Sequence, residues 1–163
     1  MDINALLDNC TLEDLVRNNL KMYQLKEGFR FGMDSVLLSW FAASFVRENS
    51  KKHKVLELGA GCGACSLLLS GRRENTLIDS VELMDTSCAV LNENIKMNGL
   101  ENRMRAFCSD IRSLDDEVRN IQYDIVMANP PFFSRKNGPA TTKDKSVERL
   151  NGRFEENGTL DEF

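Results

Sequence analysis

The stretch KVLELGAGCGA, residues 54–64, decides the fold that we expect for this chain. Its first five residues have the apolar pattern of a short strand, and glycines follow at positions 59, 61 and 63. Glycine tolerates positive φ angles and lets backbone N–H groups come close to a ligand. The spacing fits G-x-G-x-x-A, with Ala64 in the last place, which is typical of a nucleotide-binding turn between a strand and a helix.

Strand and helix patterns alternate after this turn. Helices are expected over 65–71, 85–99 and 116–120, and further strands over 78–83, 104–108 and 123–128. Such alternation predicts βαβ units around a parallel sheet, an α/β fold of the Rossmann-like type. Because right-handed crossovers put the carboxyl ends of the strands on one rim, ligands should bind there. The last strand is apolar enough to be buried on both faces.

We expect the chain to divide into an N-terminal helical cap segment, residues 1–50, and the N-terminal part of an α/β domain, residues 51–163. Thr11 begins a sequence close to a capping box, which predicts short helices joined by loops over residues 1–27. Asp34 is predicted to be the N-cap of a longer helix with an apolar face.

Length and composition suit one soluble domain of 163 residues, with 42% hydrophobic and 28% charged residues. The N-terminus lacks the basic stretch of a secretory signal, and the longest apolar run is shorter than the roughly 20 residues that a bilayer requires. We therefore expect a cytoplasmic protein without a membrane segment, in which the cysteines are reduced thiols. There are five of them: Cys10, Cys62, Cys65, Cys88 and Cys108.

The net charge of −4 argues against a chain that attracts nucleic acid over its whole surface. Charge is uneven, however, because six of the eight charged residues between Ser134 and Arg153 are basic, and Arg135 and Lys136 are the first of them. Such a segment is either a solvated loop or a contact for phosphate groups.

Acidic residues at the ends of three predicted strands indicate which nucleoside the glycine turn binds. Glu82 lies 19 residues after Gly63, where an ionised carboxylate can accept hydrogen bonds from both ribose hydroxyls; the alternative is a tight turn with a surface glutamate. Glu57 would repel the pyrophosphate of NAD but can organise contacts to the ammonium group of S-adenosylmethionine. Asp110 can accept from the adenine amine beside the apolar wall of Ile111, or it is only a turn or N-cap residue.

The sequence NPPF, residues 129–132, ends the last predicted strand on the same rim. The backbone carbonyl of Pro130 and the side-chain carbonyl of Asn129 are two acceptors that match the two donors of a planar NH2 group. Phe132 can stack on the ring that carries this amine. The stretch therefore predicts a site that aligns a primary amine with a methyl donor, although a rigid turn with core aromatics has the same sequence pattern.

The C-x-x-C pair and His53 are weaker candidates for functional residues. Cys62 and Cys65 have C-x-x-C spacing, but there is no second pair and His53 is not spaced to complete a metal site. We expect two small packing residues and no metal. His53 is predicted to lie in a charged connector, and it is not a candidate base because an amine can lose its proton after it has accepted the methyl group.

Four motifs of this chain resemble, in order and spacing, those of the class I S-adenosylmethionine-dependent methyltransferases that methylate amino groups: ELGAGCG, VEL, SDI and NPPF. The stretch 24–42 is similar to the bacterial tRNA (adenine-N6)-methyltransferases that modify adenosine 37 of a valine tRNA. Its shared features are Gln24, Gly28-Phe29-Arg30-Phe31, Asp34-Ser35, Leu37-Leu38 and Phe41-Ala42. The resemblance covers residues 20–133 well and the rest of the chain poorly.

The resemblance implies methyl transfer from S-adenosylmethionine to the N6 of an adenine in tRNA. It implies roles for three sets of residues: Gly59, Gly61, Gly63, Glu82 and Asp110 for the cofactor; Asn129, Pro130 and Phe132 for the target base; and Arg135 and Lys136 for tRNA phosphates. Alternatives are methylation of a glutamine side-chain amide in a protein, which presents the same NH2 group, and a relative that binds the cofactor without turnover.

One departure accompanies the resemblance. The family's sheet has seven strands, whereas four are visible here, so we expect an incomplete methyltransferase fold without the C-terminal strands. One edge of the sheet should then be uncovered and associate with a second copy or another partner.

Overall fold

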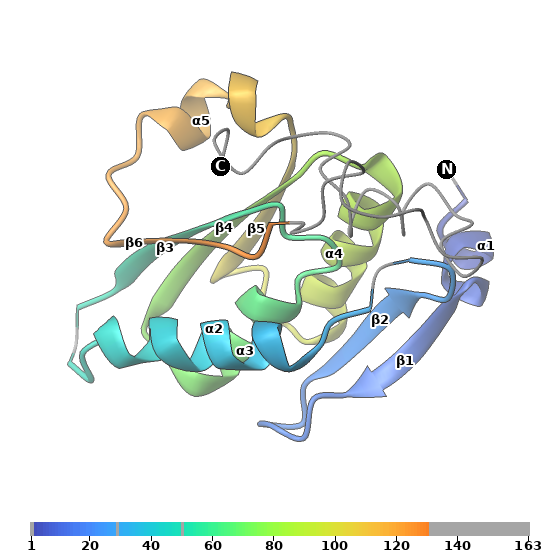
Figure 1. The fold of residues 1–163 in the computed structure, drawn as a ribbon, viewed down its shortest axis with the longest axis horizontal. Helices are drawn as coiled ribbons and strands as arrows, with labels where there is room; N and C mark the ends of the chain where they lie inside the picture. Colours follow the sequence, from blue (N-terminus) through green and yellow to red (C-terminus); the bar gives the residue numbers. More distant parts are fainter. Residues whose placement is uncertain (1, 29, 50, 131–163) are drawn as a thin grey trace, which may run out of the picture.

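The computed structural model describes residues 2–28, 30–49 and 51–130 (Figure 1). Its centre is a parallel sheet with the strand order β5-β4-β3-β6. The strands are β3 (His53–Leu58), β4 (Thr76–Glu82), β5 (Met104–Cys108) and β6 (Ile125–Ala128). The helices between them are α3 (Ala64–Arg72), α4 (Asp85–Met97), the short 3-10 helix η1 (Ile111–Ser113) and α5 (Asp116–Arg119). The predicted α/β fold with a parallel sheet is thus confirmed.

Side chains along β3 point alternately to the two faces of the sheet, and an apolar core lies on each face. Val55 packs with the residues of α2 (Met33–Phe45), α3 and α4 in the larger core on one face of the sheet. Leu56 and Leu58 point to the other face, where they pack with Val118 of α5. The sheet is therefore covered by helices on both faces, as a parallel sheet requires.

The expected helices over residues 1–27 are wrong apart from α1 (Ile3–Asp8), because residues 10–25 form an antiparallel hairpin. Its strands are β1 (Cys10–Asp14) and β2 (Lys21–Leu25). The free side of β2 is paired by side chains of α4: Asn94 accepts from Tyr23 N at 2.6 Å and donates to Tyr23 O at 2.9 Å, and Asn98 bonds both backbone groups of Lys21. Asparagine amides can replace a neighbouring strand because each carries both a donor and an acceptor.

Two further predictions are corrected at α2 and β6. Gly32, and not Asp34, is the N-cap of α2, and Asp34 lies in its first turn. Val126 on β6 is 59% exposed, so this strand is not buried on both faces. Within the described ranges β6 pairs with β3 alone and forms one edge of the sheet. Association through this edge stays a prediction.

None of the helices in the described part of the chain is long and apolar enough to cross a membrane.

Candidate functional site

The glycine turn, residues 59–63, joins β3 to α3 at the carboxyl edge of the sheet. Gly59, Gly61 and Gly63 have φ angles of 66°, 57° and 90°. A Cβ atom on Gly63 would lie 2.4 Å from Cδ1 of Leu91, whereas one on Gly61 would meet nothing within 4 Å. Gly63 thus allows the turn to lie directly against Leu91 of α4, and Gly61 leaves the outer side of the turn open.

Glu82 ends β4 and binds the glycine turn from the side. Its Oε2 accepts from Gly61 N at 2.7 Å, and its Oε1 accepts from Met84 N at 2.8 Å. Burial raises the pKa of Glu82, and the hydrogen bonds from Met84 and Gly61 oppose this rise. The interpretation as a surface glutamate is wrong, because the residue is only 8% exposed. A contact to ribose hydroxyls stays a prediction.

Glu57 lies deeper, beneath the first turn of α3. The N-cap of this helix is Gly63, which has no side chain to offer, and Glu57 supplies the missing acceptor from β3. Its Oε2 accepts from Ser66 N at 3.1 Å and also from the hydroxyl of Ser66. A carboxylate at this end of a helix also interacts favourably with the helix dipole. Its predicted role toward the cofactor's ammonium group stays a prediction.

The free energy of unfolding should depend on pH through Glu57. Burial raises its pKa from 4.5 to about 7, so between these values the folded state holds a proton that the unfolded state has lost. Stability therefore falls as pH rises from about 4.5 to about 7, by at most about 3 kcal/mol from this group. Urea unfolding of the wild type and of Glu57→Gln at pH 4.5 and 7.5 measures the difference. Equal pH dependence in the two proteins would contradict this assignment.

Asp110 follows β5 and is the N-cap of η1. Its carboxylate accepts from the backbone N–H of Arg112 at 2.9 Å and from the guanidinium of the same residue. These hydrogen bonds lower the pKa of Asp110 to about 2, so it is ionised at neutral pH. The N-cap interpretation is confirmed, and contact with an adenine amine stays a prediction. Ile111 is partly buried against the core that includes Leu56.

Asn129 lies beside the glycine turn. It follows Ala128, which pairs with Leu58 in the parallel ladder, and Gly59 follows Leu58. Asn129 and Gly59 thus begin the loops after two neighbouring strands, and such strands are about 4.8 Å apart. The first residue of NPPF and the glycine turn therefore lie on one rim, as expected.

The side-chain amide of Asn129 is held by the start of α2. Its Nδ2 donates to Oδ2 of Asp34 at 3.2 Å and to Oγ of Ser35 at 3.3 Å. Asp34 and Ser35 were not among the predicted site residues, although the pair Asp-Ser belongs to the stretch that carries the family resemblance. Pro130 is the last described residue. Phe132, Arg135 and Lys136 lie outside the described residues.

The cysteines of the C-x-x-C sequence are free thiols, of which Cys65 is buried and Cys62 half-buried. Burial raises the pKa of Cys62 to about 12 and raises that of Cys65 as well, so both stay protonated. In the described ranges no group of His, Cys, Asp and Glu side chains is arranged to hold a metal ion. His53 is not in a connector, because it begins β3 and is buried at the opposite end of this strand from the glycine turn.

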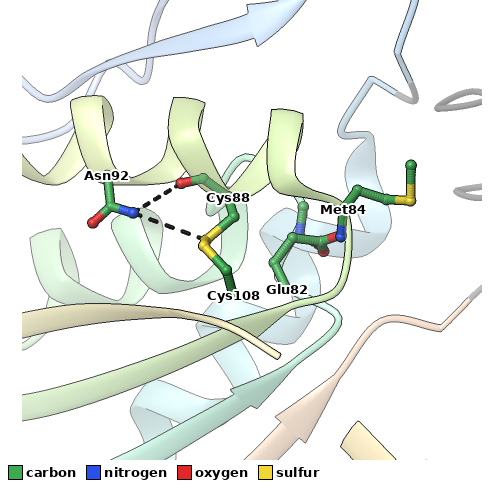
Figure 2. Close-up of a disulfide and its surroundings, with 6 residues drawn as sticks. Glu82, Met84, Cys88, Asn92 and Cys108 are labelled. Atoms are coloured by element: carbon green, nitrogen blue, oxygen red, sulfur yellow. Dashed lines mark hydrogen bonds between the residues drawn. A yellow bond between two sulfur atoms is a disulfide. The ribbon is translucent and has the colours of Figure 1, made fainter. Parts of the chain in front are cut away.

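Cys88 and Cys108 form a disulfide, so the expectation of five reduced thiols is wrong. Figure 2 shows the bridge between α4 and the end of β5, with Glu82 and Met84 nearby. Cys108 pairs with Glu82 in the β4–β5 ladder, which brings its Cα to 5.7 Å from that of Cys88. This separation is typical of disulfides. No spacing rule could have found this pair, since the sheet register creates it.

Alkylation should reveal the bridge. In protein that is denatured without a reductant, we expect a maleimide to modify three cysteines, Cys10, Cys62 and Cys65. After reduction it should modify all five. Peptide mapping by mass spectrometry measures the labelled positions, and labelling of Cys88 before reduction would contradict the disulfide.

Comparisons with known proteins show the family of this chain. The family model of the methyltransferase small domain matches residues 35–161. The tRNA1(Val) (adenine(37)-N6)-methyltransferase of Serratia proteamaculans is 31% identical over 134 residues, which are 81% of this chain and 47% of that relative. The chain spans about half the length of the curated relatives it matches.

Solved structures share the fold. The SAM-dependent methyltransferase from Agrobacterium tumefaciens superposes with a TM-score of 0.59 at 21% identity, over 76% of this chain and 40% of its own. P. horikoshii TYW2 in complex with MeSAdo superposes with a TM-score of 0.51 at 25% identity, over 66% of this chain and 39% of its own.

These findings confirm the predicted Rossmann-like fold of class I methyltransferases, and they confirm S-adenosylmethionine as the cofactor of such proteins. The glycine turn and the residues beside it are where a parallel sheet of this type binds a nucleoside. The chain belongs to the methyltransferase small domain family.

Proposed function

We propose that this chain transfers a methyl group from S-adenosylmethionine to the N6 of an adenine in tRNA, and that the base is adenosine 37 of a valine tRNA. The observation that carries the proposal is the position of Asn129 beside the glycine turn, on neighbouring strands of one sheet. The similarity to tRNA1(Val) (adenine(37)-N6)-methyltransferases supports the substrate. A cytoplasmic location follows from such a substrate.

The cofactor would lie along the carboxyl ends of β3, β4 and β5. Gly59, Gly61 and Gly63 would line it, with Glu57 behind the turn. Glu82 would accept from the ribose hydroxyls, and Asp110 and Ile111 would contact the adenine. These assignments agree with the open outer side of Gly61 and with the ionised state of Asp110.

The target amine would be held by the carbonyl oxygens of Asn129 and Pro130, with Phe132 stacked on the base. When bound there, S-adenosylmethionine would supply the methyl group: the N6 lone pair would form the new N–C bond, the C–S bond would break, and the electron pair of the broken bond would remain on sulfur in a neutral thioether. The methylated nitrogen is positively charged until it releases a proton to water. Alignment and the two acceptors supply the catalysis, because no strong base is needed.

The anticodon loop suits this chemistry, since its bases can be unstacked at modest cost. Phosphates of the tRNA would contact the basic segment that begins at Arg135 and Lys136.

Transfer of a radioactive methyl group tests the proposal. The purified chain is incubated with tritiated S-adenosylmethionine and either unmodified tRNA or a release-factor protein. We expect label in the tRNA and N6-methyladenosine among the nucleosides after digestion. Label in the protein would instead support glutamine methylation, and cofactor binding without label in either would support a relative that does not turn over.

A further inference from the structure

The two hydrogen bonds of Asn129 determine which way its amide faces. A carboxylate can only accept hydrogen bonds, so the atom that faces Asp34 must be the NH2 group and not the oxygen. Both Asp34 and Ser35 contact the same nitrogen, at 3.2 and 3.3 Å. The carbonyl oxygen of Asn129 is therefore on the opposite side of the amide, available to a donor other than these two residues.

The charge of Asp34 affects this oxygen. A hydrogen bond from an amide N–H to an ionised acceptor is stronger than one between neutral groups, and it polarises the amide so that its carbonyl oxygen becomes a better acceptor. Methyl transfer places positive charge on the target nitrogen. A negative charge that acts through the amide of Asn129 favours this transition state over the ground state.

Ser35 anchors the arrangement to the cofactor side. It is only 3% exposed, and its side chain lies close to the thiol of Cys65 in the first turn of α3. Cys65 in turn contacts Glu57, which binds the same turn of α3 from below. The buried side chains of Ser35, Cys65 and Glu57 thus connect Asn129 with the helix that follows the glycine turn.

We propose that Asp34 and Ser35 are positioning residues for methyl transfer, which hold the amide of Asn129 with its oxygen toward the target amine. This inference rests on the proposed function for its role in catalysis, whereas the orientation of the amide can be measured without catalysis. Neither residue needs to touch the substrate. The start of α2 is then a part of the site, although it precedes the glycine turn by more than 20 residues.

Kinetics test the role in catalysis. Asp34→Ala and Ser35→Ala should each lower kcat about 10- to 100-fold and leave the dissociation constant of S-adenosylmethionine within twofold. Asp34→Asn should lower kcat less than Asp34→Ala does, because an asparagine keeps an acceptor oxygen although it lacks the charge. The double variant Asp34→Ala/Asn129→Ala should have the same kcat as Asn129→Ala alone. Asp116→Ala is the matched control, an aspartate in the first turn of α5, and should behave like the wild type.

The orientation of the amide is tested by hydrogen exchange in the 15N-labelled chain. The NMR signals of the Asn129 NH2 group are identified by their loss in Asn129→Ala. Their exchange with water should be at least about tenfold faster in Asp34→Ala and Ser35→Ala, and unchanged in Asp116→Ala. Equal exchange rates in all these proteins would overturn the inference, whether or not the chain methylates tRNA.

Additive losses in the double variant would also overturn it, since a residue that acts through Asn129 has no effect once Asn129 is gone. If the wild-type chain methylates no tRNA but the exchange rates change as stated, the proposed function fails and the orientation of the amide stands.

Discussion

Replacement of Asn129 by alanine is expected to lower methyl transfer to tRNA by at least about 100-fold. The variant loses one of the two acceptors for the target NH2 group, and a single preorganised hydrogen-bonding group in a transition state is commonly worth a factor of roughly 10² to 10³. The affinity for S-adenosylmethionine should stay within twofold, because the side chain bonds α2 and not the glycine turn.

Single-turnover transfer and calorimetry measure these two quantities separately. Asn120→Ala is a suitable control, since this asparagine is the C-cap of α5 and is exposed. An equal loss of transfer and of cofactor affinity in Asn129→Ala would show that the residue supports the cofactor site instead. Retained transfer would remove Asn129 from the mechanism.

Replacement of Glu82 by alanine is expected to have the opposite profile, with a roughly 10- to 100-fold loss of cofactor affinity. Two effects combine. The ribose loses its charged acceptor, and the backbone N–H groups of Gly61 and Met84 lose the carboxylate that holds them. A buried N–H without a partner costs about 1–3 kcal/mol, part of which appears as disorder of the glycine turn.

Calorimetric titration with S-adenosylmethionine measures the loss, and thermal unfolding shows whether the variant is folded. Glu82→Gln keeps one acceptor oxygen, so it should bind the cofactor with intermediate affinity. At saturating cofactor, Glu82→Ala should regain most of its transfer rate. Unchanged affinity in a folded Glu82→Ala protein would exclude this carboxylate from the nucleoside site.

Much of the sheet follows from local sequence. The strand over 104–108 has the predicted bounds. Helix α4 begins at the predicted residue, and α3 begins one residue before it was predicted to begin. This is possible because glycines at special φ angles and apolar periodicity are local properties, and they mark where each strand ends. The rim position of Asn129 follows as well, because parallel strands bring their carboxyl ends together.

The N-terminal hairpin could not be predicted in the same way. Its first strand, CTLED, is short and mostly polar, and Thr11 suggests a cap as readily as a strand. What selects the hairpin is its contact with α4, where Asn94 and Asn98 complete the hydrogen bonds of β2. These residues are more than 70 positions away, so no local pattern contains the information.

For the site, too, some properties follow from local sequence and others only from the tertiary structure. Sequence alone determined which residue types follow the strands, and their order along one rim, because these depend on the spacing of strands and turns. Only the tertiary structure decided the environment of each group: the burial that raises the pKa of Glu57, the bridge from Cys88 to Cys108, and the amide of Asn129 held by Asp34. Such properties depend on distances between side chains of different elements, and packing sets those distances.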